Sequence, residues 1–177
     1  MRGHPNIVNF IEASSRPMGN GAHEVFILME FCPGGGIIDM MNRRLRERLT
    51  ESEILTIFLN VCEVSLQIRR WAYSRAPTTH LKGLACMHNL KPPLLHRDLK
   101  VENILQASAT SYKLCDFGSA TPAATRAPST ALELKALEHD LNRHTTLQYR
   151  APEMVDVYLR RPVDEKSGAR ILTTLPL

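Results

Sequence analysis

The stretch of sequence that decides the fold is His96-Arg97-Asp98-Leu99-Lys100-Val101-Glu102-Asn103, a polar run between the apolar pairs Leu94-Leu95 and Ile104-Leu105. Two further motifs follow it in order, Asp116-Phe117-Gly118 and Ala151-Pro152-Glu153. Any one tripeptide can arise by chance, but the polar run with both partners in this order effectively cannot. The three motifs therefore belong to one functional arrangement.

The residues before this run predict a β-hairpin. Ile7 to Glu12 and Glu24 to Glu30 are apolar runs rich in Ile, Val and Phe, and the turn-forming cluster 14–21 lies between them as a long loop. Pro33-Gly34-Gly35-Gly36 then breaks the chain. After the polar run, Tyr112 to Cys115 predicts another short strand.

Helical patterns fill much of the remainder. Apolar residues at three- and four-residue steps predict a helix from Ile38 to Leu49. Thr50 and Glu53 form a capping-box pattern that opens the next helix. A third, short helix is predicted from 132 to 141, after a flexible Ala-, Pro- and Thr-rich segment at 121–130. The fold class expected from these elements is α+β.

Residues 64–82 interrupt the second helix. Deleting them joins Glu63 to Gly83 and aligns Ile54, Ile57, Phe58, Val61, Leu84 and Met87 on one amphipathic stripe. The chain has 22 Lys and Arg against 18 Asp and Glu, and this segment carries four basic residues and no acid, so the remainder is neutral. We interpret 64–82 as an aberrant insert, either translated intron or a gene-model error.

Composition narrows the class of protein. Hydrophobic residues make up 44% of the 177-residue chain and charged residues 23%, which is typical of a globular domain. A neutral remainder gives no support for nucleic-acid binding, no apolar run is long enough to span a membrane, and the N-terminus lacks a signal-peptide pattern. Four widely spaced cysteines predict reduced thiols. We therefore expect a cytoplasmic location.

The three motifs resemble the signature set of protein kinases. Among protein kinases, the sequence most resembles the Numb-associated kinases, particularly the fungal actin-regulating serine/threonine kinases. The resemblance is carried by segments such as Leu28-Met-Glu-Phe-Cys-Pro-Gly-Gly-Gly and His144-Thr-Thr-Leu-Gln-Tyr-Arg-Ala-Pro-Glu-Met. The resemblance implies a partial kinase domain over 1–167. Its parts are the end of the N-terminal lobe (1–30), a hinge (31–36) and a partial, mainly helical C-terminal lobe (37–167), followed by a non-family tail (168–177).

The resemblance also implies roles for individual residues. Asp98 would orient the acceptor hydroxyl and take its proton, and Lys100 would lie near the transferred phosphate of ATP. Asn103 and Asp116 offer the hard oxygen ligands that Mg²⁺ prefers. Lys100 and Thr146 indicate the serine/threonine branch, with a Ser or Thr acceptor on a protein substrate and endocytic adaptors as candidate substrates.

By the same resemblance, five residues form the adenine pocket. Met29 is the gatekeeper, the Glu30 carbonyl and the Cys32 amide would hydrogen-bond adenine, and Leu105 and Cys115 line the pocket floor. Phe10, His96 and Phe117 match stacked positions, so packing is the expected role of His96. Arg97 pairs with a phosphate on the activation segment, for which Thr145 and Thr146 are weak candidates, or else anchors that segment.

The sequence also departs from the family pattern. It contains no G-x-G-x-x-G loop and no strand lysine paired with a helix glutamate, and the arginine that normally pairs with Glu153 is expected to be missing. We therefore expect a fragment truncated at both ends, with marginal stability and negligible turnover. Two alternatives are a non-catalytic pseudokinase or interaction fragment, and a gene-model artefact without function.

Overall fold

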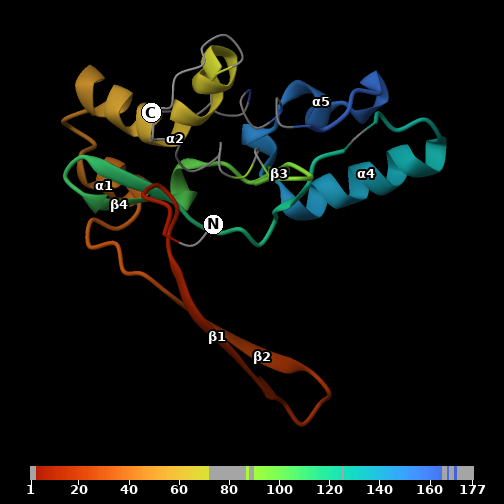
Figure 1. Ribbon diagram of the computed structural model, residues 1–177, viewed down its shortest axis with the longest axis horizontal. Coiled ribbons are helices and arrows are strands. Elements are labelled where there is room, and N and C mark those ends of the chain that lie inside the picture. The colour runs from red at the N-terminus through yellow and green to blue at the C-terminus, as the bar shows by residue number, and fades with distance from the viewer. Residues whose placement is uncertain are drawn as a thin grey trace.

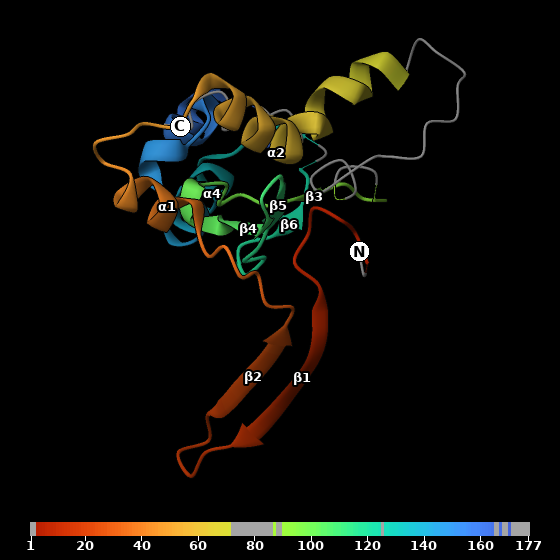
Figure 2. The same ribbon diagram turned by 90° about the vertical axis from the view of Figure 1, so that its left-hand side faces the viewer.

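The computed structural model describes residues 3–71, 87, 90–124, 126–164, 167 and 170, and for 62–71 it describes the backbone alone. Both views show helices and short sheets gathered into one body, from which a β-hairpin projects (Figures 1 and 2). Within the described residues, three two-stranded antiparallel sheets accompany the helices. The α+β class predicted from the sequence is therefore confirmed.

The projecting hairpin pairs β1 (Phe10–Pro17) with β2 (His23–Met29). Its turn is shorter than the predicted loop at 14–21, since residues 14–17 belong to β1 and Met18 N–H donates to the Ala22 carbonyl at 2.8 Å. Arg16 explains the extension. It lies opposite Glu24 in the register, donates to that carboxylate through Nε at 3.0 Å, and lies 5.6 Å above the Phe26 ring.

The first helix, α1 (Ile37–Arg43), ends six residues before the predicted boundary at Leu49. The chain leaves the helix at Arg44, whose Nη1 pairs with Glu53 Oε1 at 2.5 Å at the start of the following helix. Leu45 is 81% exposed as a result, so it does not continue the apolar stripe that the spacing indicated.

The long helix α2 (Glu51–Trp71) begins at the predicted capping box. Thr50 N–H donates to Glu53 Oε2 at 2.8 Å, and Glu53 N–H donates to Thr50 Oγ1 at 3.2 Å. The helix continues past the predicted break at Val64, because residues 64–71 contain neither Pro nor Gly. The rest of the 64–82 segment lies outside the described residues. Met87, predicted on the same stripe as Ile57, is fully buried with it in one core cluster.

Short elements surround the polar run. β3 (Leu94–Leu95) leads into it and pairs with β6 (Thr121–Pro122), the first part of the segment predicted to be flexible. The 3₁₀ helix η1 (Val101–Asn103) follows, and then the hairpin of β4 (Ile104–Ser108) and β5 (Ser111–Leu114). These elements bring the polar run and the Asp116 motif to the same side of the body.

The C-terminal part is helical. It comprises α4 (Ala131–His144), η2 (Leu147–Tyr149), α5 (Pro152–Val155) and η3 (Val157–Leu159). α4 buries Leu134 and Leu141 in the core cluster that also contains Met154 and Ile104. No helix among the described residues is long and apolar enough to cross a membrane.

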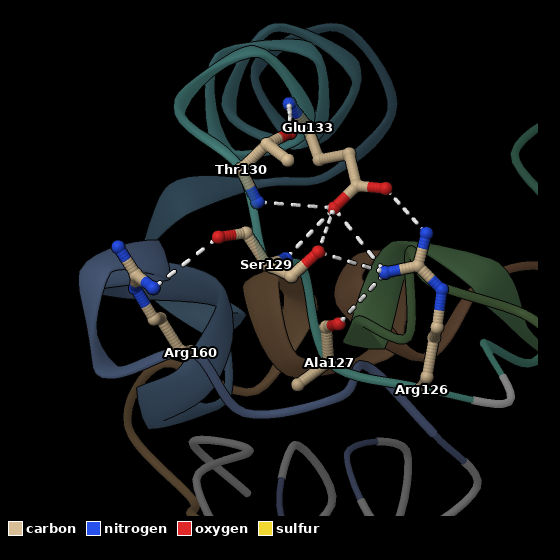
Figure 3. A network of polar contacts seen from close by, with 6 residues as sticks. All are labelled: Arg126, Ala127, Ser129, Thr130, Glu133 and Arg160. Atoms are coloured by element: carbon tan, nitrogen blue, oxygen red, sulfur yellow. Dashed lines mark hydrogen bonds and ion pairs between the residues drawn. The ribbon is translucent and has the colours of Figure 1, made fainter.

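Polar contacts fix the start of α4 (Figure 3). Thr130 and Glu133 form a capping box, and Arg126 pairs with Glu133. Ser129 donates to the same carboxylate through its amide at 2.7 Å, and its carbonyl accepts from Arg160 Nη1 at 3.2 Å (Figure 3). The hydrogen bond from Arg126, followed by the amides of Ser129 and Thr130, lowers the pKa of Glu133. These contacts define where α4 begins.

Candidate active site

His96 packs the base of the site. Its side chain is 1% exposed, Nε2 lies 2.9 Å from the Cys115 carbonyl, and its ring centroid lies 5.0 Å from that of Phe117. Burial lowers the pKa of the imidazole, so the neutral form is favoured. This environment agrees with the packing role predicted for His96 rather than that of a base.

Asp98 forms a polar cluster with Lys100 and Thr146. Lys100 Nζ lies 2.7 Å from Asp98 Oδ2, and the Thr146 hydroxyl donates to Asp98 Oδ1 at 2.7 Å. Lys100 also donates to Thr146 Oγ1 at 3.2 Å, which closes a three-membered network. Burial raises the pKa of Asp98, but hydrogen bonds from Lys100 and Thr146 outweigh it and hold the pKa below its ordinary value. Asp98 is therefore an ionised acceptor at neutral pH.

Asn103 and Asp116 lie on adjoining segments, since the Cys115 N–H donates to the Asn103 carbonyl at 2.9 Å. The Asn103 amide nitrogen donates to the Asp98 carbonyl at 2.9 Å, which leaves its oxygen for other ligands. Asp116 has a positive φ of 57° and is exposed. Among the described residues no three His, Cys, Asp or Glu side chains converge as a metal site. One amide and one carboxylate oxygen suit Mg²⁺, which usually retains water and phosphate ligands.

A cavity of about 530 Å³ adjoins Asp116. Met29, Phe10 and Ile27 from the hairpin line one side, and Cys115 and Phe117 line the other, so the predicted gatekeeper and one predicted floor residue face the same space. Burial, followed by the negative charge of Asp116, raises the pKa of the Cys115 thiol to about 11. Cys115 is therefore an uncharged apolar lining group at neutral pH.

The predicted hinge is attached to the β4–β5 hairpin. The Gly34 N–H donates to the Gln106 carbonyl at 3.0 Å, and the Gln106 N–H donates to the Gly35 carbonyl at 2.8 Å. A Cβ on Gly34 would lie 2.6 Å from Cβ of Gln106, so this close approach requires glycine. Leu105, the neighbour of Gln106, forms an isolated antiparallel β-bridge with Gly36. Cys32, the hinge residue predicted to contact adenine, is 6% exposed.

The side chain of Glu30, just before the hinge, makes a contact that the sequence did not indicate. Its carboxylate pairs with Lys113 of β5 and accepts from the Asn9 N–H at 2.9 Å. Burial raises the pKa of Glu30, but the hydrogen bonds from Lys113 and the Asn9 N–H and the charge of Lys113 together outweigh it, so the net pKa is lowered. Glu30 therefore links the end of β2 to β5, which continues into Cys115 and Asp116 of the pocket.

Glu153 pairs with Arg170, although the arginine that pairs with it in the family was expected to be missing. Glu153 is 1% exposed, and its Oε1 lies 2.5 Å from Arg170 Nη1 and 2.5 Å from the Ser167 hydroxyl. Arg170 belongs to the segment assigned as a non-family tail. Spacing alone could not reveal the pair, because its two members are 17 positions apart in the sequence.

The polar run at 96–103 lies against the Asp-Phe-Gly segment, and that segment lines the cavity. This arrangement is of the kinase type. The protein kinase domain model matches residues 1–169, so the chain belongs to the protein kinase family.

Individual relatives narrow the family to serine/threonine kinases. The chain is 46% identical over 169 residues to "Serine/threonine-protein kinase ppk30" of Schizosaccharomyces pombe, covering 94% of this chain and 16% of the relative. It is 42% identical over 168 residues to "Actin-regulating kinase PRK1" of Saccharomyces cerevisiae, covering 94% and 18%. A third relative, the kinase-domain protein ppk38 of S. pombe, is 49% identical over 152 residues, covering 86% and 20%. The chain thus spans about a fifth or less of these relatives.

Proposed function

We propose that this domain transfers the γ-phosphoryl group of ATP to Ser or Thr side chains of protein substrates, with Mg²⁺ held by Asn103 and Asp116. The observation that carries the proposal is the network joining Asp98, Lys100 and Thr146. It keeps Asp98 ionised and fixes both carboxylate oxygens.

The network gives each residue a distinct task. Bound MgATP supplies the phosphoryl group and its charge-neutralising metal. Asp98 orients the acceptor hydroxyl and takes its proton, while Lys100 places a positive charge where negative charge develops. Thr146 holds Asp98 through its hydroxyl. For the adenine pocket we propose Met29, Glu30, Cys32, Leu105 and Cys115, of which Met29 and Cys115 are among the residues that line the cavity.

Phosphotransfer is tested in the chain and in a chimera that places a Gly-rich loop and strand lysine of a protein kinase before it. The chain lacks both features, so we expect negligible turnover from 1–177 and measurable turnover from the chimera. Asp98→Asn should lower the rate of the chimera by about 10²–10⁴-fold. Glu102→Gln serves as the matched control, because Glu102 is an exposed acid in η1. Equal rates for both variants would overturn the proposed role of Asp98.

We further propose that the substrates include endocytic adaptor proteins in the cytoplasm. The support is the resemblance to fungal actin-regulating kinases, and one relative is named as an actin-regulating kinase. Phosphoproteomics after acute inhibition of the natural kinase should show loss of Ser and Thr phosphorylation on such adaptors. Unchanged adaptor phosphorylation would refute the substrate assignment but leave the chemistry intact.

A non-catalytic interaction module is the second candidate, favoured by the exposed apolar side chains of the hairpin. Val25 is 61% exposed, Ile27 59% and Leu28 55%. Exposed apolar patches are typical of surfaces that bind other proteins. Mg²⁺-dependent ATP binding by the chimera that disappears in Asp116→Asn would favour the kinase; no such binding by the chimera would favour the interaction module.

A further inference from the structure

A second cavity lies between α1 and the start of α2, at the edge of the body where the connection 44–50 loops outward (Figure 2). Its volume is about 560 Å³, within the ~300–1,000 Å³ range of ligand-binding pockets. Its apolar lining comes from α1, the connection and α2: Ile38, Met41, Leu45, Leu49 and Ile54. It shares no described lining residue with the pocket beside Asp116, so it is a separate site.

The apolar lining is the stripe that the spacing predicted for a helix over 38–49. Because α1 ends at Arg43, this stripe is only partly packed away, and Leu45 is 81% exposed. Ile38 and Ile54 are half-buried, and Met41 and Leu49 are partly buried against the core. Exposed apolar surface in a concave site is typical of places where another molecule binds.

The charge at the cavity is positive. Among the described residues, both charged side chains that line it are arginines, Arg44 and Arg48. Arg44 Nη1 lies 2.5 Å from Glu53 Oε1, so its charge is largely neutralised. Arg48 is exposed and forms no ion pair with any residue that the structure describes, and the neighbouring acid Glu47 does not line the cavity. An occupant of the cavity therefore meets an apolar floor beside one uncompensated guanidinium.

We propose that this cavity docks an acidic amphipathic segment of a partner protein, with its apolar side chains between α1 and α2 and its carboxylates beside Arg48. An amphipathic helix that binds in a groove uses apolar anchors at i, i+3, i+4 and i+7. Charge complementarity selects an acidic segment over a basic one. The docking goes beyond the proposed function, because it uses none of the residues assigned to phosphotransfer.

Two labelled synthetic helical peptides test the proposal by fluorescence anisotropy with the 177-residue chain. Both carry leucines at i, i+3, i+4 and i+7, and the residues beside the leucines are glutamates in one peptide and lysines in the other. We expect the glutamate peptide to bind about fivefold more tightly, and we expect this preference to shrink as the salt concentration rises.

Three variants assign the binding to the cavity. Arg48→Glu should reverse the preference between the peptides. Arg161→Glu, the same change of charge at an exposed arginine that does not line the cavity, should preserve it. Leu45→Ser should weaken binding of the glutamate peptide by about tenfold, because it removes an apolar contact. Since Leu45 is 81% exposed in the free chain, this change leaves the core intact.

The proposal is overturned if neither peptide binds, if both bind equally, or if Leu45→Ser keeps full affinity. Sedimentation of the chain without peptide examines the other occupant. A dimer that Leu45→Ser dissociates would mean that a second copy fills the cavity, which also overturns the proposal, whereas a monomer that prefers the glutamate peptide supports it. Because the binding assay needs no ATP, failure of the proposed phosphotransfer would leave its outcome unchanged.

Discussion

Replacing Arg170 by Ala should destabilise the domain, because Arg170 is the cationic partner of a carboxylate that is 1% exposed. Breaking a buried ion pair from one side costs about 3–5 kcal/mol. The Arg170 side chain is itself 46% exposed, so solvent screening reduces this value, and the Ser167 hydroxyl still donates to Glu153. We therefore expect a loss of about 2 kcal/mol, or about a 30-fold rise in the unfolding equilibrium constant.

The pH dependence gives this prediction a second signature. Burial raises the pKa of Glu153, but hydrogen bonds, first from Ser167 and then from Arg170, outweigh it and lower the pKa below 4.5. A lowered carboxyl pKa contributes stability that is present above the ordinary value and is lost as pH falls through the folded value. The difference between wild type and Arg170→Ala should therefore be largest near neutral pH and shrink below pH 4.5.

Urea unfolding of both proteins across this pH range measures the effect. Arg161→Ala, at an exposed arginine, should stay within about 0.5 kcal/mol of wild type. In a Glu153→Gln background, Arg170→Ala should cost much less, because no buried charge is left unpaired. A loss below about 0.5 kcal/mol at neutral pH, or an equal loss in both backgrounds, would refute the reasoning.

Two further predictions concern the site. Thr146→Val should raise the pKa of Asp98, measured by carboxyl NMR titration, because it removes one of the hydrogen bonds that lower it, whereas Thr146→Ser should leave the pKa nearly unchanged. Gly34→Ala should destabilise the chain by about 1–3 kcal/mol in urea unfolding, because its Cβ would lie 2.6 Å from Gln106. Gly19→Ala, with no atom within 4 Å of its Cβ, is the control, and equal stabilities for the two variants would contradict the packing argument.

Local patterns predicted the helix starts well and the helix ends poorly. The capping box at Thr50 and the helix over 132–141 both appear where spacing and side-chain chemistry placed them, since a helix start is encoded by a few adjacent residues. The end of α1 depends on the pairing of Arg44 with Glu53 of α2, and the length of β1 depends on a cross-strand contact between Arg16 and Glu24. Such contacts are tertiary or cross-strand and leave no periodic signal.

By itself, the sequence determined the family and the chemical types of the site residues, because ordered motifs around Asp98, Asn103 and Asp116 are specific without any knowledge of distance. Only the tertiary structure decided which charges meet. It pairs Arg97 with Asp140 and Glu153 with Arg170, and it places Lys113 against Glu30. The physical reason is that a buried charge is stabilised by the counter-ion that the packed elements place next to it. The distance between two residues along the sequence does not predict which of them will form such a pair.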